Sequence, residues 1–262
     1  MSNQNTEFNI HHADDHDTVL KDPVGAKKGD VIIACDFASA EETLRFLDRF
    51  GEERPFVKIG MELYYSSGPD IVRTLKARGH RIFLDLKLHD IPNTVKKAMR
   101  VLSELGADIV NLHAAGTRAM MEAALEGLTR PDGSRPLLIA VTQLTSTDQA
   151  AMEQELLISR PLEEVVIAYA QNAAAAGLDG VVCSPLEAGK VHAACGEDFL
   201  TVTPGVRFAD GDRGDQKRVT TPAEAKELGS NFIVVGRPIT ASSHPVEAWR
   251  RCRLEFCPPC DR

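Results

Sequence analysis

The chain has 262 residues and a formal net charge of −8, with 43% hydrophobic and 26% charged residues. Such a composition is that of a globular protein able to bury its own core. The acidic balance argues against a nucleic acid polymer or an anionic membrane as the main partner. No apolar run approaches the roughly 18 residues that a membrane-spanning helix needs.

The two ends of the chain predict tails. Residues 1–29 are polar and lack periodicity, which predicts a flexible N-terminal tail without the apolar segment of a secretory signal. Residues 257–262 form a short C-terminal tail whose Cys257 and Cys260 have no second pair, so we expect no metal. The six cysteines show no disulfide-framework spacing, which indicates reduced thiols and a cytoplasmic protein.

Short apolar, β-branched runs follow from residue 30 and alternate with helical patterns. Each run is almost wholly apolar, as expected of parallel strands buried on both faces. Eight strands are predicted: Asp30–Asp36, Phe56–Ile59, Arg81–Lys87, Ile109–His113, Leu137–Thr142, Gly180–Ser184, Leu200–Thr203 and Phe232–Val235.

The intervening segments read as helices, the clearest being Glu41–Phe50, Pro92–Leu105, Leu162–Ala176 and a closing helix at Val246–Leu254. Eight strand–helix units predict an α/β fold of the (β/α)8 TIM-barrel type, which occupies about 250 residues. We therefore expect one catalytic domain over residues 30–256. An open doubly wound sheet is the alternative, and it is disfavoured because the first strand-to-helix turn lacks a Gly-rich phosphate fingerprint.

Two connections are longer than simple turns, Leu144–Arg160 and Arg207–Thr220. Both follow predicted strands and would therefore lie on the face where barrels build their active sites. Long loops in a compact domain are usually lids or binding loops.

Charged residues occupy the ends of three predicted strands. Asp85 and Lys87 are two residues apart, so on a strand their side chains point to the same face. Lys58 interrupts the second strand and Asp36 closes the first. Any one of these is more often part of a rim ion pair than a catalytic group, but four at matched strand ends favour a site.

The third strand opens a specific motif. Asp85-Leu86-Lys87-Leu88-His89-Asp90-Ile91-Pro92-Asn93-Thr94-Val95 resembles the signature of orotidine 5′-phosphate decarboxylases. The resemblance covers about residues 30–250 and looks closest to the bacterial branch. Further segments agree in order: Ala34–Phe37, Val57–Gly60, Val141–Ser146, Thr203–Arg207, Asp215–Val219 and Val235–Ile239.

The resemblance implies cofactor-free decarboxylation of orotidine 5′-monophosphate to UMP, the last step of de novo UMP synthesis. It implies catalytic roles for Lys58, Asp85, Lys87 and Asp90 as an alternating charge network, with Asp90 supplied by the neighbouring subunit of a homodimer. Lys87 would donate a proton to C6. His89 and His113 are expected to hydrogen-bond or pack rather than act as bases.

The remaining implied residues bind substrate. Asp36 and Lys58 would bind ribose hydroxyls, and Thr145 the pyrimidine edge. Thr94 would reach the partner's site, and Ile91 is included among the binding residues. The phosphate would be held by Arg207, Gln216, Gly236 and Arg237, near strands seven and eight as the barrel rule predicts.

Two other functions stay open. One is a metal-assisted phosphosugar enzyme on the same scaffold, such as a hexulose-phosphate synthase or a keto-gulonate phosphate decarboxylase. Ile91-Pro92-Asn93-Thr94 and Gln143-Leu144-Thr145-Ser146 favour the pyrimidine nucleotide instead. The other is a non-enzymatic nucleotide-binding barrel, which is weakened because every expected charged position is occupied.

Overall fold

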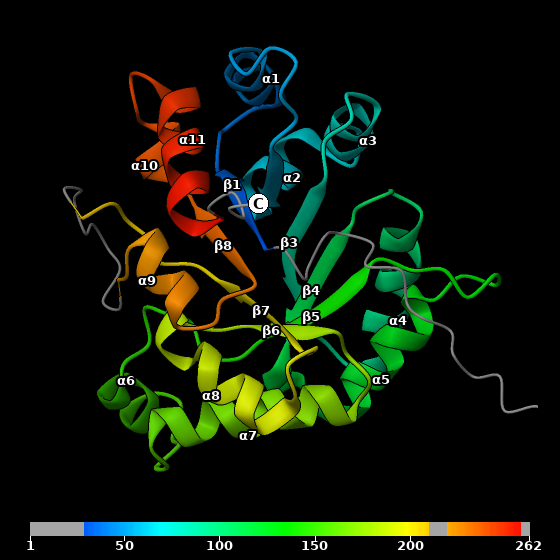
Figure 1. Cartoon of the computed structure of the whole chain (residues 1–262). Helices are drawn as coiled ribbons and strands as arrows, with labels where there is room; N and C mark the ends of the chain where they lie inside the picture. Colours follow the sequence, from blue (N-terminus) through cyan, green and yellow to red (C-terminus); the bar gives the residue numbers. More distant parts are fainter. Residues whose placement is uncertain (1–28, 210–218, 258–262) are drawn as a thin grey trace, which may run out of the picture.

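The computed structural model describes residues 29–209 and 219–257 and shows eight parallel strands in a closed barrel (Figure 1). The last strand pairs with the first through Asp30↔Phe232, which closes the sheet. The strands are β1 (Asp30–Cys35), β2 (Phe56–Gly60), β3 (Ile82–Leu88), β4 (Ile109–His113), β5 (Leu137–Val141), β6 (Gly180–Val182), β7 (Leu200–Thr203) and β8 (Phe232–Val235).

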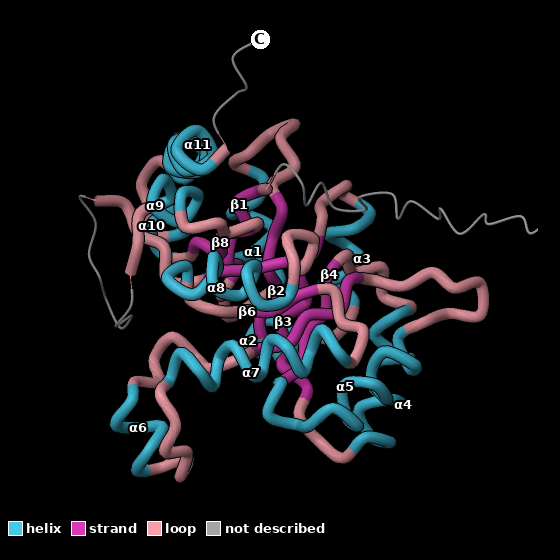
Figure 2. The backbone as a smooth tube through the Cα atoms, turned by 60° about the horizontal axis from the view of Figure 1, so that its bottom comes forward, coloured by secondary structure: helices cyan, strands magenta, loops and turns pink. Residues whose placement is uncertain are grey.

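Helices surround the strands, as the end-on and tilted views show (Figures 1 and 2). A 3-10 turn at Ala114–Gly116 precedes α5. The helices are α1 (Ala40–Asp48), α2 (Met61–Ser67), α3 (Asp70–Ala77), α4 (Pro92–Ser103), α5 (Thr117–Leu128), α6 (Gln149–Gln154), α7 (Leu162–Ala175), α8 (Pro185–Cys195), α9 (Pro222–Glu227), α10 (Arg237–Thr240) and α11 (Pro245–Phe256).

The predicted barrel is confirmed, with differences at the ends of elements. Strands β4, β7 and β8 have the predicted bounds, β3 is shifted by one residue at both ends, and the others differ by one or two residues at their carboxyl end. The predicted loop Leu144–Arg160 is not wholly irregular, because it contains α6, whose N-terminus is capped by the Asp148 carboxylate. Figure 2 shows α6 projecting from the barrel. Residues 1–28, 210–218 and 258–262 lie outside the described residues, so the predicted tails stay predictions.

Alternation along each strand divides the core into two layers. On β1, Val31, Ile33 and Cys35 pack outward against the helices, whereas Ile32 and Ala34 belong to the cluster inside the barrel. The inner cluster also contains Phe56, Phe83, Ile109, Ile139, Leu200, Val202, Phe232 and Val234. Following the same alternation toward the carboxyl ends brings Asp36, Lys58, Asp85 and Lys87 onto the lumen side.

Polar side chains link neighbouring strands at the amino-terminal end of the barrel, before every second strand. Asp108, Asp179 and Asn231 each precede a strand directly (β4, β6 and β8). Their side-chain oxygens accept hydrogen bonds from backbone N–H groups of the preceding strand, at Ile82 (2.7 Å), Leu138 (2.7 Å) and Thr201 (2.8 Å). Arg135 also pairs with Asp179. These contacts stabilise the barrel at the amino ends of its strands, the face on which barrels do not build active sites.

We expect Asp179→Ala to lower the free energy of unfolding by about 1–3 kcal/mol, because the Leu138 N–H and the Arg135 guanidinium lose their partner. Turnover per folded molecule should not change, since Asp179 lies at the far end of the barrel. Chemical denaturation and a steady-state assay measure the two effects. Asp48→Ala, which removes only an exposed pair with Arg78, should shift stability by less than about 0.5 kcal/mol.

Candidate active site

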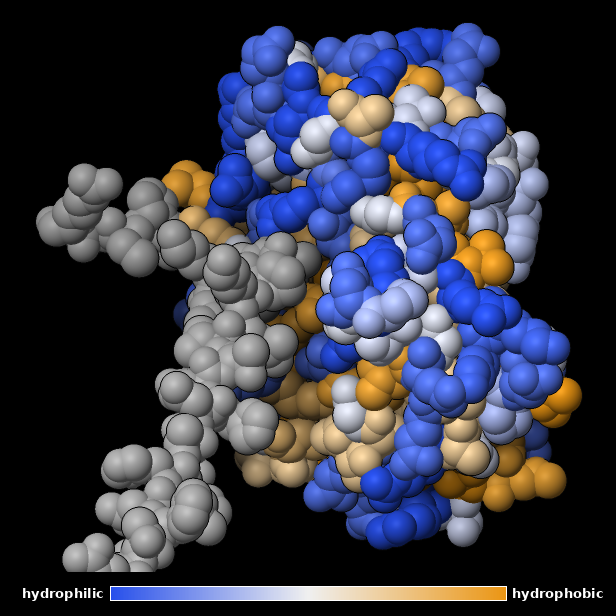
Figure 3. Space-filling view, turned by 90° about the vertical axis from the view of Figure 1, so that its right-hand side faces the viewer, coloured by the Kyte–Doolittle hydropathy of each residue, from blue (hydrophilic) through white to orange (hydrophobic). Residues whose placement is uncertain are grey.

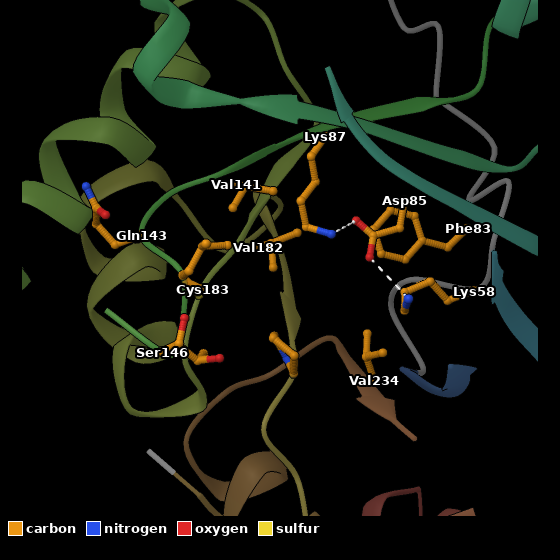
Figure 4. Close-up of a pocket in the computed structure, with 13 residues that line it drawn as sticks. Lys58, Phe83, Asp85, Lys87, Val141, Gln143, Ser146, Val182, Cys183 and Val234 are labelled. Carbon is orange, nitrogen blue, oxygen red and sulfur yellow. Dashed lines mark hydrogen bonds and ion pairs between the residues drawn. The ribbon is translucent and has the colours of Figure 1, made fainter. Parts of the chain in front are cut away.

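A row of alternating charges lies at the carboxyl ends of β1, β2 and β3. Lys58 Nζ is 2.8 Å from Asp36 Oδ1 and 3.4 Å from Asp85 Oδ2. Lys87 Nζ donates to Asp85 Oδ1 at 2.6 Å. The order Asp36–Lys58–Asp85–Lys87 places each charge beside opposite ones, which offsets the desolvation of the two innermost groups. Figure 4 shows the Lys87–Asp85–Lys58 part of the row.

The network fixes the ionisation of its buried members. Burial alone would raise the pKa of Asp85, but the charges of Lys58 and Lys87 and hydrogen bonds from Lys87 and Asn111 hold that pKa below its ordinary value. Burial likewise acts to lower the pKa of Lys58, and the Asp85 and Asp36 carboxylates outweigh it and raise that pKa. Asp85 and Lys58 therefore face the lumen as a carboxylate and an ammonium at neutral pH.

Close approach at the end of β2 depends on a glycine. A Cβ on Gly60 would lie 2.9 Å from Asp36 Oδ1 and 3.1 Å from Lys58 Nζ. The side chain of any larger residue would displace the ion pair, so the absence of a side chain at Gly60 allows the Asp36–Lys58 contact.

Lys87 has a backbone conformation that is unusual for its residue type. Its φ of +52° lies in the left-handed region, which costs a non-glycine residue about 1–2 kcal/mol. The register between β3 and β4 also shifts here, from Leu84↔Val110 to Leu88↔Leu112. Strained backbone of this kind concentrates at functional sites.

The charge row forms one wall of a cavity of about 230 Å³. The rest of the lining is largely apolar and comes from strands around the barrel, through Phe83, Val141, Val182 and Val234, and from Pro204 directly after β7. Gln143 and Ser146 lie across the cavity from the charge row (Figure 4), and Leu144, Thr145 and Cys183 complete the lining. Such a cavity suits a small, partly planar ligand with polar groups on opposite edges.

Comparison with known proteins identifies the family. The profile described as "Orotidine 5'-phosphate decarboxylase / HUMPS family" matches residues 29–252. The chain belongs to the orotidine 5′-phosphate decarboxylase / HUMPS family. The match includes all eight strands and every residue of the charge row.

Several individual members of this family are similar to the chain over most of its length. A protein of Geobacillus sp. (strain WCH70) named orotidine 5′-phosphate decarboxylase is 57% identical over 86% of this chain and 95% of its own length. A Bacillus caldolyticus protein of the same name is also 57% identical, over 86% and 93%. The crystal structure of the Lactobacillus acidophilus orotidine 5′-phosphate decarboxylase superposes with a TM-score of 0.78 at 43% identity, covering 87% of this chain and 99% of that one.

The structure brings together part of the predicted site. Lys58, Asp85, Lys87 and Thr145 line the cavity, and Asp36 joins it through Lys58. Asp90, Ile91 and Thr94 do not line this cavity; they are exposed at and before the start of α4. Ile91 is 67% exposed, which is high for an apolar side chain.

The predicted phosphate residues follow β7 and β8. Arg207 is buried and its guanidinium donates to the Val206 carbonyl at 2.8 Å. Gly236 follows β8 as the N-cap of α10, and Arg237 is exposed at the first position of that helix. Gln216 lies outside the described residues. None of the three described residues lines the 230 Å³ cavity, which reaches β7 and β8 through Pro204 and Val234.

Sequence reasoning did not single out Asn111, the polar side chain that contacts both Asp85 and Lys87. Its signal was available, because an amide interrupts the apolar strand Ile-Val-Asn-Leu-His. His113 ends the same strand, and its ring lies 5.6 Å from that of His89. Burial, together with the charges of His89 and Lys87, lowers the pKa of His113. Neither histidine lines the cavity.

Proposed function

We propose that this protein decarboxylates orotidine 5′-monophosphate to UMP and CO2, with Lys87 as the proton donor to C6. The observation that carries the proposal is the Lys58–Asp85–Lys87 network on one wall of an otherwise largely apolar cavity. The name shared by relatives at up to 57% identity supports the substrate.

The reaction needs a cation and a proton donor beside C6, and the Lys87 ammonium can supply both. When the bond between C6 and the carboxylate carbon breaks, its electron pair stays on C6 in the ring plane, where the ring cannot delocalise it. A preorganised cation beside C6 stabilises that charge. The Lys87 ammonium then transfers a proton to C6 and becomes an amine, which solvent reprotonates.

Asp85 would lie beside the departing carboxylate. Its ionised state is maintained by Lys58, Lys87 and Asn111. In this position it holds Lys87 toward the substrate and repels the substrate carboxylate, which is lost as neutral CO2. Only the repulsion is relieved when the carboxylate leaves, whereas the hold on Lys87 persists through the reaction; both favour the transition state over the bound substrate.

The remaining contacts orient the nucleotide. Asp36 and Lys58 bind the ribose hydroxyls, and Thr145 binds the pyrimidine edge across the cavity. Arg207, Gly236 and Arg237, with Gln216, hold the phosphate. The position of the described members after β7 and β8 supports this role, because barrels bind phosphate at that part of the rim. A planar guanidinium also presents paired donors to a phosphate.

The active enzyme in this proposal is a homodimer in which Asp90, Ile91 and Thr94 of each subunit complete the partner's site. Their exposure on a single chain supports it. Exposed apolar residues on the same helix and on α2 agree, with Val101 of α4 and Tyr65 of α2 each more than half exposed. The side of the molecule that carries α4 shows hydrophobic atoms among hydrophilic ones (Figure 3).

We place the reaction in the cytoplasm. Among the described residues, Cys35 and Cys252 are buried thiols outside any disulfide, and burial raises the pKa of Cys35 to about 12. Buried neutral thiols pack as small apolar groups and need no oxidising compartment. In the same described residues, no helix is long and apolar enough to cross a membrane.

Loss of the ultraviolet absorbance of orotidine 5′-monophosphate tests the reaction directly. We expect turnover by the wild type that is unchanged after dialysis against EDTA and after addition of Mg²⁺. Activity that falls with the chelator and returns with Mg²⁺ would instead favour a phosphosugar enzyme of the metal-assisted kind. Tight binding of the nucleotide without conversion would indicate a non-enzymatic binding protein.

A further inference from the structure

The stretch Asp85–Lys87 faces β4 in an irregular register. Leu84 pairs with Val110 and Leu88 pairs with Leu112, so three β3 residues oppose the single residue Asn111. A regular parallel ladder would match these strands residue for residue. The two extra residues belong to the segment that carries Asp85 and Lys87, and they leave backbone groups there without regular ladder partners.

The Asn111 side chain supplies hydrogen bonds where the backbone ladder between β3 and β4 is irregular. Its Oδ1 accepts from the Lys87 backbone N–H at 2.8 Å, and its Nδ2 donates to Asp85 Oδ1 at 2.7 Å. These partners fix the orientation of the amide, since one can only donate and the ionised other can only accept. Asn111 is 1% exposed and does not line the cavity, so it contacts the two charged residues from the neighbouring strand without facing the cavity.

We infer that Asn111 is a positioning residue for the reaction, holding the Lys87 backbone in its left-handed conformation and the Asp85 carboxylate against the Lys87 ammonium. The inference rests on the proposed function, because it assigns Asn111 to the decarboxylation chemistry of this site. Lys87 Nζ and Asn111 Nδ2 share the same oxygen of Asp85. One amide therefore couples the main chain of the proton donor to the group that orients its side chain.

Two substitutions separate positioning from general packing. Asn111→Ala removes both hydrogen bonds. Asn111→Asp keeps the shape and the acceptor for the Lys87 N–H, but replaces the donor to Asp85 by a second carboxylate. We expect kcat to fall by about 10- to 100-fold in both variants, because misplaced catalytic groups cost this much. KM should stay within about threefold, since the ribose and phosphate contacts remain.

The pH profile gives a readout that a structural role would not produce. Repulsion from Asp85 and burial raise the pKa of the new carboxyl in Asn111→Asp. Once protonated, that carboxyl again donates to Asp85 and accepts from the Lys87 N–H. The kcat of Asn111→Asp divided by that of the wild type should therefore rise as the pH falls, whereas the same ratio for Asn111→Ala should stay flat.

The other titratable groups around Asn111 are present in all variants, and the charges of Lys58 and Lys87, which lower the pKa of Asp85 more than Asn111 does, keep Asp85 ionised in each of them. These groups are Asp85 and Lys87 on β3, Lys58 on β2, His113 at the end of β4 and His89 beside it. Asn231→Asp is the matched control. Asn231 also accepts from a strand N–H through its side chain, but at the opposite end of the barrel, so its variant should keep the wild-type kcat and pH profile.

Thermal unfolding supplies a second readout that needs no turnover. A raised pKa in the folded state means that folded Asn111→Asp binds more protons than the unfolded chain. Its Tm relative to the wild type should thus increase as the pH falls through that raised pKa. If the wild type converts no orotidine 5′-monophosphate, the proposed function fails and this Tm dependence alone decides whether the amide holds Asp85. Wild-type kcat in both variants, or losses whose ratios to the wild type are equally flat with pH, would overturn the inference.

Discussion

Replacing Lys87 by alanine is expected to lower kcat by at least about 10³-fold, because in the proposed mechanism this one side chain supplies both the stabilising cation and the proton. Lys87→Arg should be nearly as inactive, since a guanidinium keeps the charge but does not release a proton at neutral pH. The measurement is the ultraviolet change of orotidine 5′-monophosphate in single-turnover and steady-state assays.

Both variants should still fold and bind nucleotide. The Lys87 side chain is a quarter exposed and lies on the cavity wall, so its removal opens no hole in the core. Lys190→Ala is the control for a lysine paired with one carboxylate, because Lys190 pairs with Glu163 on the surface. That variant should keep the wild-type rate. Substantial turnover by Lys87→Ala would show that the proton comes from elsewhere.

The shared face of Asp85 and Lys87 was predictable from the sequence, although for an incomplete reason. Alternation along a strand predicts that residues two apart lie on one face, and both side chains do line the cavity. The backbone does not continue as a regular strand, because Lys87 has a positive φ and the register shifts beside it. Alternation predicts which way a side chain points but contains no information about the neighbouring strand's register.

Asn111 could not be assigned from the sequence for the same reason. A polar residue within an apolar strand signals a buried hydrogen bond, yet its partners lie 24 and 26 positions earlier in the chain. Only the paired arrangement of β3 and β4 shows that both partners belong to the proposed site. Similarly, α6 is short and polar, and it is defined by the Asp148 cap rather than by apolar periodicity.

The strands were easier because their signal is local. Ile109–His113, Leu200–Thr203 and Phe232–Val235 are apolar runs bounded by polar or glycine-containing turns, and their bounds agree with the sequence prediction. The predicted roles of Asp90, Ile91 and Thr94 cannot be judged in the same way as the strand bounds. They depend on a second subunit, so neither the sequence pattern nor the geometry of one chain tests them.

Mixing two inactive variants tests those roles. In the proposed dimer, each site combines Lys87 of one subunit with Asp90 of the other. A mixed dimer of Lys87→Ala and Asp90→Ala subunits then contains one site with both substitutions and one site with neither. Random exchange at equal concentrations makes about half of the dimers mixed, so about one quarter of all sites should be of wild-type composition. Activity should return to about that fraction of the wild type.

A second mixture provides the control for this result. Asp85 and Lys87 of one subunit belong to the same site, with Lys87 Nζ 2.6 Å from Asp85 Oδ1. A mixed dimer of Asp85→Ala and Lys87→Ala subunits therefore has one substitution in each site. No activity should return, even though the subunits exchange to the same extent. Exchange itself can be followed by mass spectrometry of isotope-labelled subunits. If exchange is complete and neither mixture regains activity, each site is built from one chain. Asp90 then does not contribute to the partner subunit's site.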